Sequence, residues 1–239
     1  MALALGGQLT LKAVDTPIFP LPLRELSLGE IMHWGFPHRN LTEEVRRWRS
    51  RNMPHLWRGL SRVLAGRILG IPHFYGQLYL ATIAPSGQRT ELGLASMRVI
   101  TDVGVEFIVN CFMGLSTASN MKYHGFGIDG TIEVQANTKL ISELTTEYNP
   151  ANTRPTGTAT LGDDGAGGPP LKNVFRTKGL LTPTDSVTLV EHGIFSQASP
   201  TGGTPVGGYL LDRSVFTPYN LIESFSLEAT YDLTFNAGG

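Results

Sequence analysis

The sequence predicts a mainly β protein, a β-sandwich or jelly-roll-like fold with a few short helices and an extended N-terminal arm. Near the C-terminus, apolar residues occupy every second position from Leu227 to Phe235, as in a strand with one buried face. Short apolar runs separated by Gly, Pro, Thr and Ser recur through the second half of the chain. That spacing is typical of strands joined by turns. The first forty residues instead combine prolines with scattered apolar side chains.

This N-terminal composition favours an extended arm over residues 13–37, because proline fixes φ and removes an amide donor. The segment contains Pro17, Pro20, Pro22 and Pro37 among leucines and aromatic residues. An extended apolar segment is stabilised only along another surface. We expect that surface to belong to a neighbouring molecule; the chain's own β domain is the alternative.

A basic helical segment follows the arm. Asn40 and Glu43 have the spacing of a capping box, which predicts a helix over residues 41–52 that ends at Pro54. A second apolar stripe at helical spacing predicts another helix over residues 56–68. We therefore divide the chain into residues 1–75, an arm with a basic helical segment, and residues 76–239, a β-rich domain.

Charge is distributed unevenly along a chain whose net charge is only −1. Residues 1–98 hold 12 Lys or Arg against 6 Asp or Glu, whereas residues 99–239 hold 7 against 14. Eight arginines lie between Arg39 and Arg67. Such asymmetry indicates a charged partner, which can be nucleic acid, an acidic protein surface or the acidic half of another copy. Arginines that merely solvate the outer face of a helix are the alternative.

The β-rich part begins with a predicted hairpin of strands at 77–84 and 91–100. Thr101 and Asp102 then start a short apolar helix that ends by Gly114 and that we expect to be substantially buried. Further expectations are a strand at 121–128, a short helix or turn at 137–147 and a loop over 149–170. Four strands at 173–181, 186–196, 208–216 and 224–235 complete the prediction.

Little in the sequence points to catalysis, so we expect no enzymatic activity, no cofactor and no metal. Cys111 lies in an apolar run and is interpreted as a buried free thiol. His124 and His192 each precede a glycine; the neighbouring Glu191 should face the other side of its strand, so His192 is interpreted as a core or subunit-contact residue. Asp163 and Asp164 lie in a glycine-rich turn without the spacing of a calcium loop. Neither a membrane span nor a secretory signal is predicted.

Six segments between residues 94 and 239 together resemble structural proteins of tailed bacteriophages. They are residues 96–109, 121–125, 144–150, 190–196, 211–216 and 227–235. The resemblance implies a virion component, and capsid decoration (cement) proteins are the group it favours. The resemblance does not itself fix the position in the particle. For a member of the decoration group we expect a place on the capsid surface, the major capsid protein as partner and a homo-oligomer, most simply a trimer. Assembly in the host cytoplasm is expected because neither a membrane span nor a secretory signal is predicted.

A cement protein needs contact area and complementary charge rather than a catalytic pocket. The candidate partner-binding residues are therefore tryptophans and arginines of the first part of the chain, which are favoured contact residues in interfaces. They are Trp34, Arg46, Arg47, Trp48, Arg49, Arg51, Trp57, Arg58 and Arg62. A tail, neck or fibre protein for adaptor assembly or host attachment is the alternative. Nucleic-acid binding is less favoured because Trp48 and Trp57 fall on apolar stripes.

Overall fold

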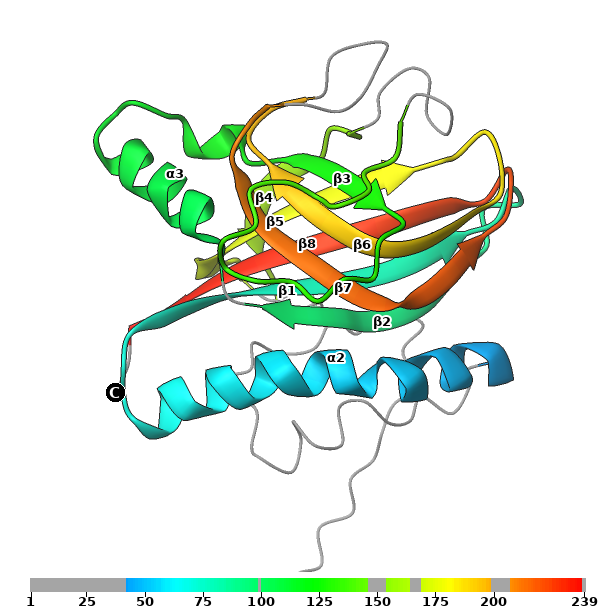
Figure 1. Ribbon diagram of the computed structural model, residues 1–239, viewed down its shortest axis with the longest axis horizontal. Helices are drawn as coiled ribbons and strands as arrows, with labels where there is room; N and C mark the ends of the chain where they lie inside the picture. Colours follow the sequence, from blue (N-terminus) through cyan, green and yellow to red (C-terminus); the bar gives the residue numbers. More distant parts are fainter. Residues whose placement is uncertain (1–41, 99, 146–153, 164–168, 199–206, 238–239) are drawn as a thin grey trace, which may run out of the picture.

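The computed structural model describes residues 42–98, 100–145, 154–163, 169–198 and 207–237, and these confirm a mainly β fold (Figure 1). The expected arm, Trp34 and Asp164 lie outside these residues. Two antiparallel sheets account for the eight strands assigned in the described chain. They are β1 (His73–Ile83), β2 (Arg89–Arg98), β3 (Tyr123–Gly127), β4 (Thr158–Gly162), β5 (Leu171–Leu181), β6 (Val187–Phe195), β7 (Leu210–Leu221) and β8 (Ser226–Asn236).

The larger sheet has the strand order β2-β1-β8-β5-β4, and the smaller has the order β3-β6-β7. The predicted hairpin is the β1–β2 pair, and the four predicted C-terminal strands are β5 to β8. Strand β8 is central because it pairs with β1 on one side and β5 on the other. Its alternating apolar residues are buried from Leu227 to Leu233, as their spacing predicts, and Phe235 is partly exposed.

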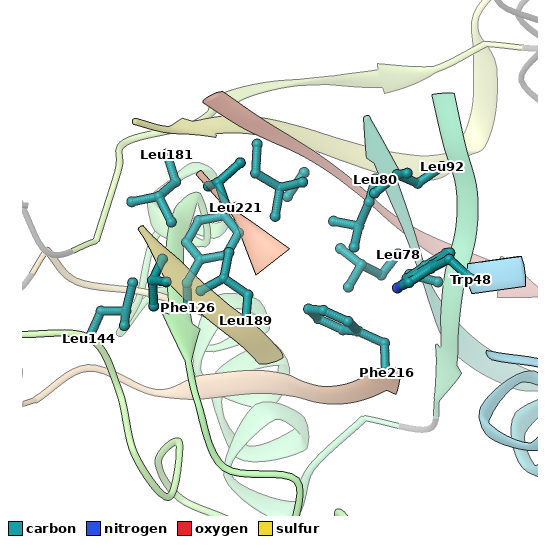
Figure 2. Close-up of a cluster of buried hydrophobic side chains, with 14 of the residues drawn as sticks. Trp48, Leu78, Leu80, Leu92, Phe126, Leu144, Leu181, Leu189, Phe216 and Leu221 are labelled. Carbon is teal, nitrogen blue, oxygen red and sulfur yellow. The ribbon is translucent and has the colours of Figure 1, made fainter. Parts of the chain in front are cut away.

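The two sheets face each other across the main hydrophobic core (Figure 2). Strand β1 contributes Leu78 and Leu80 from the larger sheet, while Phe126, Leu189 and Phe216 come from the three strands of the smaller one. At one side of the sandwich the smaller sheet is joined to the segment that leads into β4, since the His124 amide donates to the Pro155 carbonyl at 2.9 Å. This arrangement fixes a rigid body on which the helices lie.

The basic segment forms one helix, α2 (Glu43–Ile68), so the prediction of two helices separated at Pro54 is wrong. Pro54 cannot donate to the carbonyl of Ser50, four residues earlier. Both residues are exposed, so the missing hydrogen bond lies on the solvent side of the helix, where water can replace it. Packing of the opposite face against β2 holds both halves in line. The helix is capped by Thr42, whose Oγ1 accepts from the Val45 amide at 3.3 Å; Asn40 lies outside the described residues. The predicted boundary after residue 75 falls within β1.

The second helix, α3 (Asp102–Phe112), begins where the sequence predicts, with the Thr101 hydroxyl accepting from the Gly104 amide at 3.0 Å. Its expected burial is wrong. Only Gly104 and Phe107 are buried, whereas Phe112 is 85% exposed. A single face of the helix packs on β7, because Gly104 allows close approach to the Leu211 backbone. The remaining apolar side chains face outward.

Two further expectations need correction. Residues 137–147, for which the sequence predicts a short helix or turn with Leu140, Ile141 and Leu144 facing inward, form no helix in their described part. Leu140 and Leu144 are buried, but Ile141 is 48% exposed. The backbone lies along β3, with the Leu144 amide donating to the Phe126 carbonyl at 2.8 Å. The expected loop over 149–170 contains β4. An edge strand needs backbone partners on one side only, so the weakly patterned sequence of β4 suffices once β5 is beside it.

Candidate functional site

Helix α2 has one face that belongs to the fold. Val45, Trp48, Asn52 and Val63 are buried there. Asn52 joins two strands, because its Nδ2 donates to the Ala95 carbonyl at 2.5 Å and its Oδ1 accepts from the Thr217 amide at 2.8 Å. The helix therefore has a fixed orientation, and its other face is presented to solvent.

That solvent-facing side is basic. Arg47, Arg51, Arg58 and Arg62 follow one another at helical spacings of four, seven and four residues and are all exposed, so they form a stripe along one side. We call this stripe the basic face. Arg47 pairs with Glu43 at 3.1 Å, whereas no described acidic residue pairs with Arg58 or Arg62.

The remaining predicted contact residues divide into exposed residues and residues that pack inside the fold. Arg46 and Trp57 are exposed, and Trp57 retains 55% of its surface beside the basic face. Trp48 is instead a core residue, since it is 2% exposed and its Nε1 donates to the Thr217 carbonyl at 2.9 Å. Arg49 turns toward the sheet, where its Nε donates to the Leu92 carbonyl at 2.6 Å, and burial lowers its pKa. Trp48 and Arg49 thus serve the fold.

Sequence reasoning missed a second exposed surface, on α3. Val105, Val109 and Phe112 lie at positions i, i+4 and i+7 of this helix and are 39%, 52% and 85% exposed. They form an unpaired apolar stripe, which we call the α3 stripe. Asp102 and Glu106 are exposed along its edge. The signal in the sequence was the spacing of Asp102 and Glu106, four residues apart, which places two charged side chains on one face of a helix that was expected to be buried.

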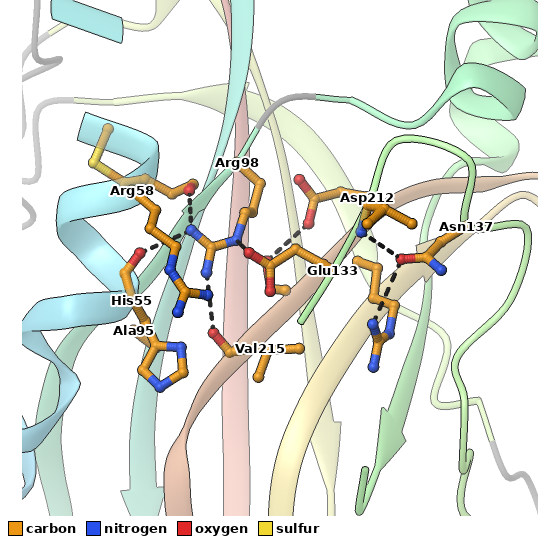
Figure 3. Close-up of polar contacts among 12 residues, drawn as sticks. His55, Arg58, Ala95, Arg98, Glu133, Asn137, Asp212 and Val215 are labelled. Carbon is orange, nitrogen blue, oxygen red and sulfur yellow. Dashed lines mark hydrogen bonds and ion pairs between the residues drawn. The ribbon is translucent and has the colours of Figure 1, made fainter. Parts of the chain in front are cut away.

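Buried polar groups connect α2 to both sheets (Figure 3). The Arg98 guanidinium pairs with Glu133 at 2.5 Å and donates to the His55 carbonyl of α2 at 2.8 Å. Nearby, burial raises the pKa of the Asp212 carboxyl to about 7 despite a hydrogen bond from the Ser214 hydroxyl. The predicted contact residue Arg58 projects beside this cluster. The cluster anchors the helix that carries the basic face.

The two histidines singled out in the sequence contact each other. His124 Nδ1 lies 3.0 Å from His192 Nε2, and His124 Nε2 lies 3.2 Å from the Thr177 hydroxyl. Both rings are fully buried. Desolvation lowers the pKa of His124 to about 3 and that of His192 well below its usual value. Of the two interpretations of His192, a core residue or a subunit contact, the first is correct.

Cys111 is a free thiol, as expected, but it is half-buried, so the expected burial is only partly met. Within the described ranges, no group of three His, Cys, Asp or Glu side chains is placed to hold a metal ion. None of the helices in that part of the chain has the length and apolar character needed to cross a membrane. Comparison with protein families, curated proteins and solved structures finds no match.

Proposed function

We propose that this chain is a structural virion protein that decorates and stabilises the outer surface of a phage capsid. One observation carries the proposal: two chemically different surfaces, the basic face of α2 and the α3 stripe, lie outside one rigid sandwich. Such surfaces bind macromolecules through area and charge. The likeness of residues 94–239 to tailed-phage structural proteins supports the same class.

In this proposal the partners are the major capsid protein and further copies of the chain, a trimer being the simplest oligomer. The exposed arginines of the basic face suit acidic protein surfaces, because each guanidinium can bind a carboxylate through two hydrogen bonds. Trp57 beside them adds an aromatic contact of the kind that carries binding energy. The proline-rich residues 13–37 are proposed as an additional arm that lies on a neighbouring subunit.

The test is co-sedimentation of the purified chain with expanded, undecorated capsids. We expect saturable binding at a fixed ratio to the major capsid protein, and greater resistance of the decorated capsids to heat. Capsids that already carry their decoration protein are the control and should bind little. An absence of binding to undecorated capsids contradicts the proposal.

A tail, neck or fibre protein is the second candidate. It is favoured by the turns that join β1 to β2, β5 to β6 and β7 to β8, which are largely exposed and gather at one end of the sandwich (Figure 1). The copy number in purified particles separates the two, because decoration requires many copies and a tail position few. Nucleic-acid binding through the basic face predicts an affinity that falls steeply with salt. Binding of that kind to phage DNA, without binding to capsids, would favour a different function.

A further inference from the structure

We propose that α3 of one copy docks onto α2 of a second copy in a head-to-tail contact. In it, Asp102 and Glu106 meet the basic face, and the α3 stripe packs against Trp57. This inference rests on the proposed function only in treating the chain as an assembly subunit. Of the two partners proposed above, the basic face then binds a second copy of the chain, and the capsid binds elsewhere. Helices α2 and α3 lie on different sides of the sandwich (Figure 1), so a contact between the two surfaces has to join two molecules.

The first argument is complementary charge at equal spacing. Arg58 and Arg62 lie four residues apart on α2, and Asp102 and Glu106 lie four residues apart on α3; all four are exposed. Among described residues, the polar contact of these two acidic side chains is a long hydrogen bond, 3.5 Å, from the Tyr209 hydroxyl to Glu106. Carboxylates and guanidinium groups at matching intervals can pair in register across two helices.

The second argument is that each charged pair is flanked by exposed apolar side chains. On α2 the flank is Trp57, and on α3 it is the α3 stripe. Angular positions at 100° per residue place the apolar group on the same rotational side of the charged pair in both helices. With this arrangement, the charged pairs of the two helices face each other and the apolar groups face each other only if the helices run antiparallel. The proposed contact is therefore antiparallel.

This orientation fixes the register. Pairing Arg58 with Glu106 and Arg62 with Asp102 places Trp57 between Val105 and Val109 of the other copy. It also brings Phe112 near Met53, which is half-buried on α2. The exposed small residues Ser61 and Ala65 lie between the apolar and charged flanks of α2, and they allow close approach. Because α3 is about 16 Å long at 1.5 Å per residue, it covers only the central part of α2.

When two molecules bind through two different surfaces, the pair still has one free basic face and one free α3 stripe. Further copies can therefore add until the rotation closes a ring, or without limit if it does not close. A trimer is one closed solution. An α3-to-α3 contact, in contrast, would stop at a dimer and would not involve arginine.

The test measures the mass of the purified full chain by light scattering after size exclusion, without capsids. We expect a mass above that of the monomer at low salt, decreasing as salt screens the pairs. Arg58→Glu removes the α2 surface, and Val109→Asp removes the α3 surface. Each variant alone should be monomeric. A mixture of the two should form a dimer and nothing larger, because only one contact between them remains intact.

Glu44→Lys is the matched control, since it also reverses one charge on α2, and Glu44 is exposed but lies outside the proposed register. It should assemble like the unmodified chain. Thermal unfolding of each variant checks that the fold is retained. A monomeric unmodified chain at low salt overturns the inference, as does assembly unaffected by Arg58→Glu, or folded variants that stay monomeric when mixed. Because no capsid is present, these outcomes leave the decoration proposal to its own experiment.

Discussion

Trp48 and Thr217, 169 positions apart in the chain, are joined by a buried hydrogen bond of 2.9 Å from the indole Nε1 to the backbone carbonyl. The contact attaches α2 to β7, and the indole ring also packs in the main core (Figure 2). It distinguishes Trp48 from Trp57, which is nine residues away on the same helix and 55% exposed.

Replacing each tryptophan by alanine should therefore have very different effects. Trp48→Ala leaves a cavity and an unpaired carbonyl, so we expect the free energy of unfolding to fall by about 3–5 kcal/mol. Trp57→Ala should change it by less than about 0.5 kcal/mol. Urea denaturation of both variants provides the measurement. Equal losses would show that Trp57 also belongs to the core.

A second contrast concerns two arginine–glutamate pairs. Arg154 binds Glu143 through two hydrogen bonds of 2.6 and 2.9 Å in a buried site, and its guanidinium lies 3.6 Å from the centre of the Phe195 ring. Burial raises the pKa of Glu143. Arg154→Met should lower the free energy of unfolding by about 3–5 kcal/mol, because it leaves a buried carboxyl without its partner. Thermal and urea unfolding would measure this loss.

The matched control is Arg47→Met. Its partner Glu43 is on the surface of α2 at 3.1 Å, and both side chains are mostly exposed. Water and salt screen such a pair, so the expected loss is at most about 0.5 kcal/mol. A loss for Arg154→Met no greater than this would contradict the assignment of that pair to the core.

The buried histidine pair predicts loss of stability in acid. Both pKa values lie below that of an unfolded histidine, near 6.5. The unfolded chain therefore binds more protons, and stability falls as pH decreases below about 6.5 toward the folded pKa values. In His192→Gln the amide can still bond to His124, but one titrating group is gone. The pH dependence of the unfolding free energy should become shallower by about 1.4 kcal/mol per pH unit between roughly pH 4 and 6. An unchanged slope in urea titrations would contradict this.

Asp212 should act in the opposite direction. Its pKa is raised to about 7 from 3.8 by burial, so the folded chain retains a proton that the unfolded chain releases. Its contribution to stability therefore decreases as pH rises between about 4 and 7. The amide of Asp212→Asn does not titrate. Relative to the unmodified chain, this variant should gain about 1.4 kcal/mol per pH unit across that range. A stability difference that does not vary with pH would refute the prediction.

Local sequence signals located most of the strands and both helix regions. The alternation in β8 and the Thr101 cap of α3 depend on neighbouring residues alone, and both are found in the structure. The edge strand β4 could not be found in this way, because its pairing with β5 supplies what its own sequence lacks. The continuation of α2 through Pro54 likewise depends on packing against β2, since a proline reads locally as a helix end.

For the candidate surfaces too, local sequence predicts some features and tertiary packing decides the others. Charge asymmetry predicted a basic helix with exposed arginines, and Arg58 and Arg62 are exposed as expected. It did not predict that Arg49 would turn inward to the Leu92 carbonyl, nor that Arg98 and Arg213 would lie buried beside Glu133 and Glu191. An arginine on a helix or strand has the same local pattern whether its partner is water or a carboxylate from a distant segment.

The sequence by itself determined the mainly β class, the positions of most of the regular elements and the separation of basic from acidic halves. These features follow from periodicity, capping and composition, which are properties of residues close together in the chain. Tertiary structure alone decided that Trp48 is buried while Trp57 is exposed, that His124 pairs with His192, and that the apolar stripe of α3 faces outward. Each depends on which distant segment covers a given face, and short-range patterns do not carry that information.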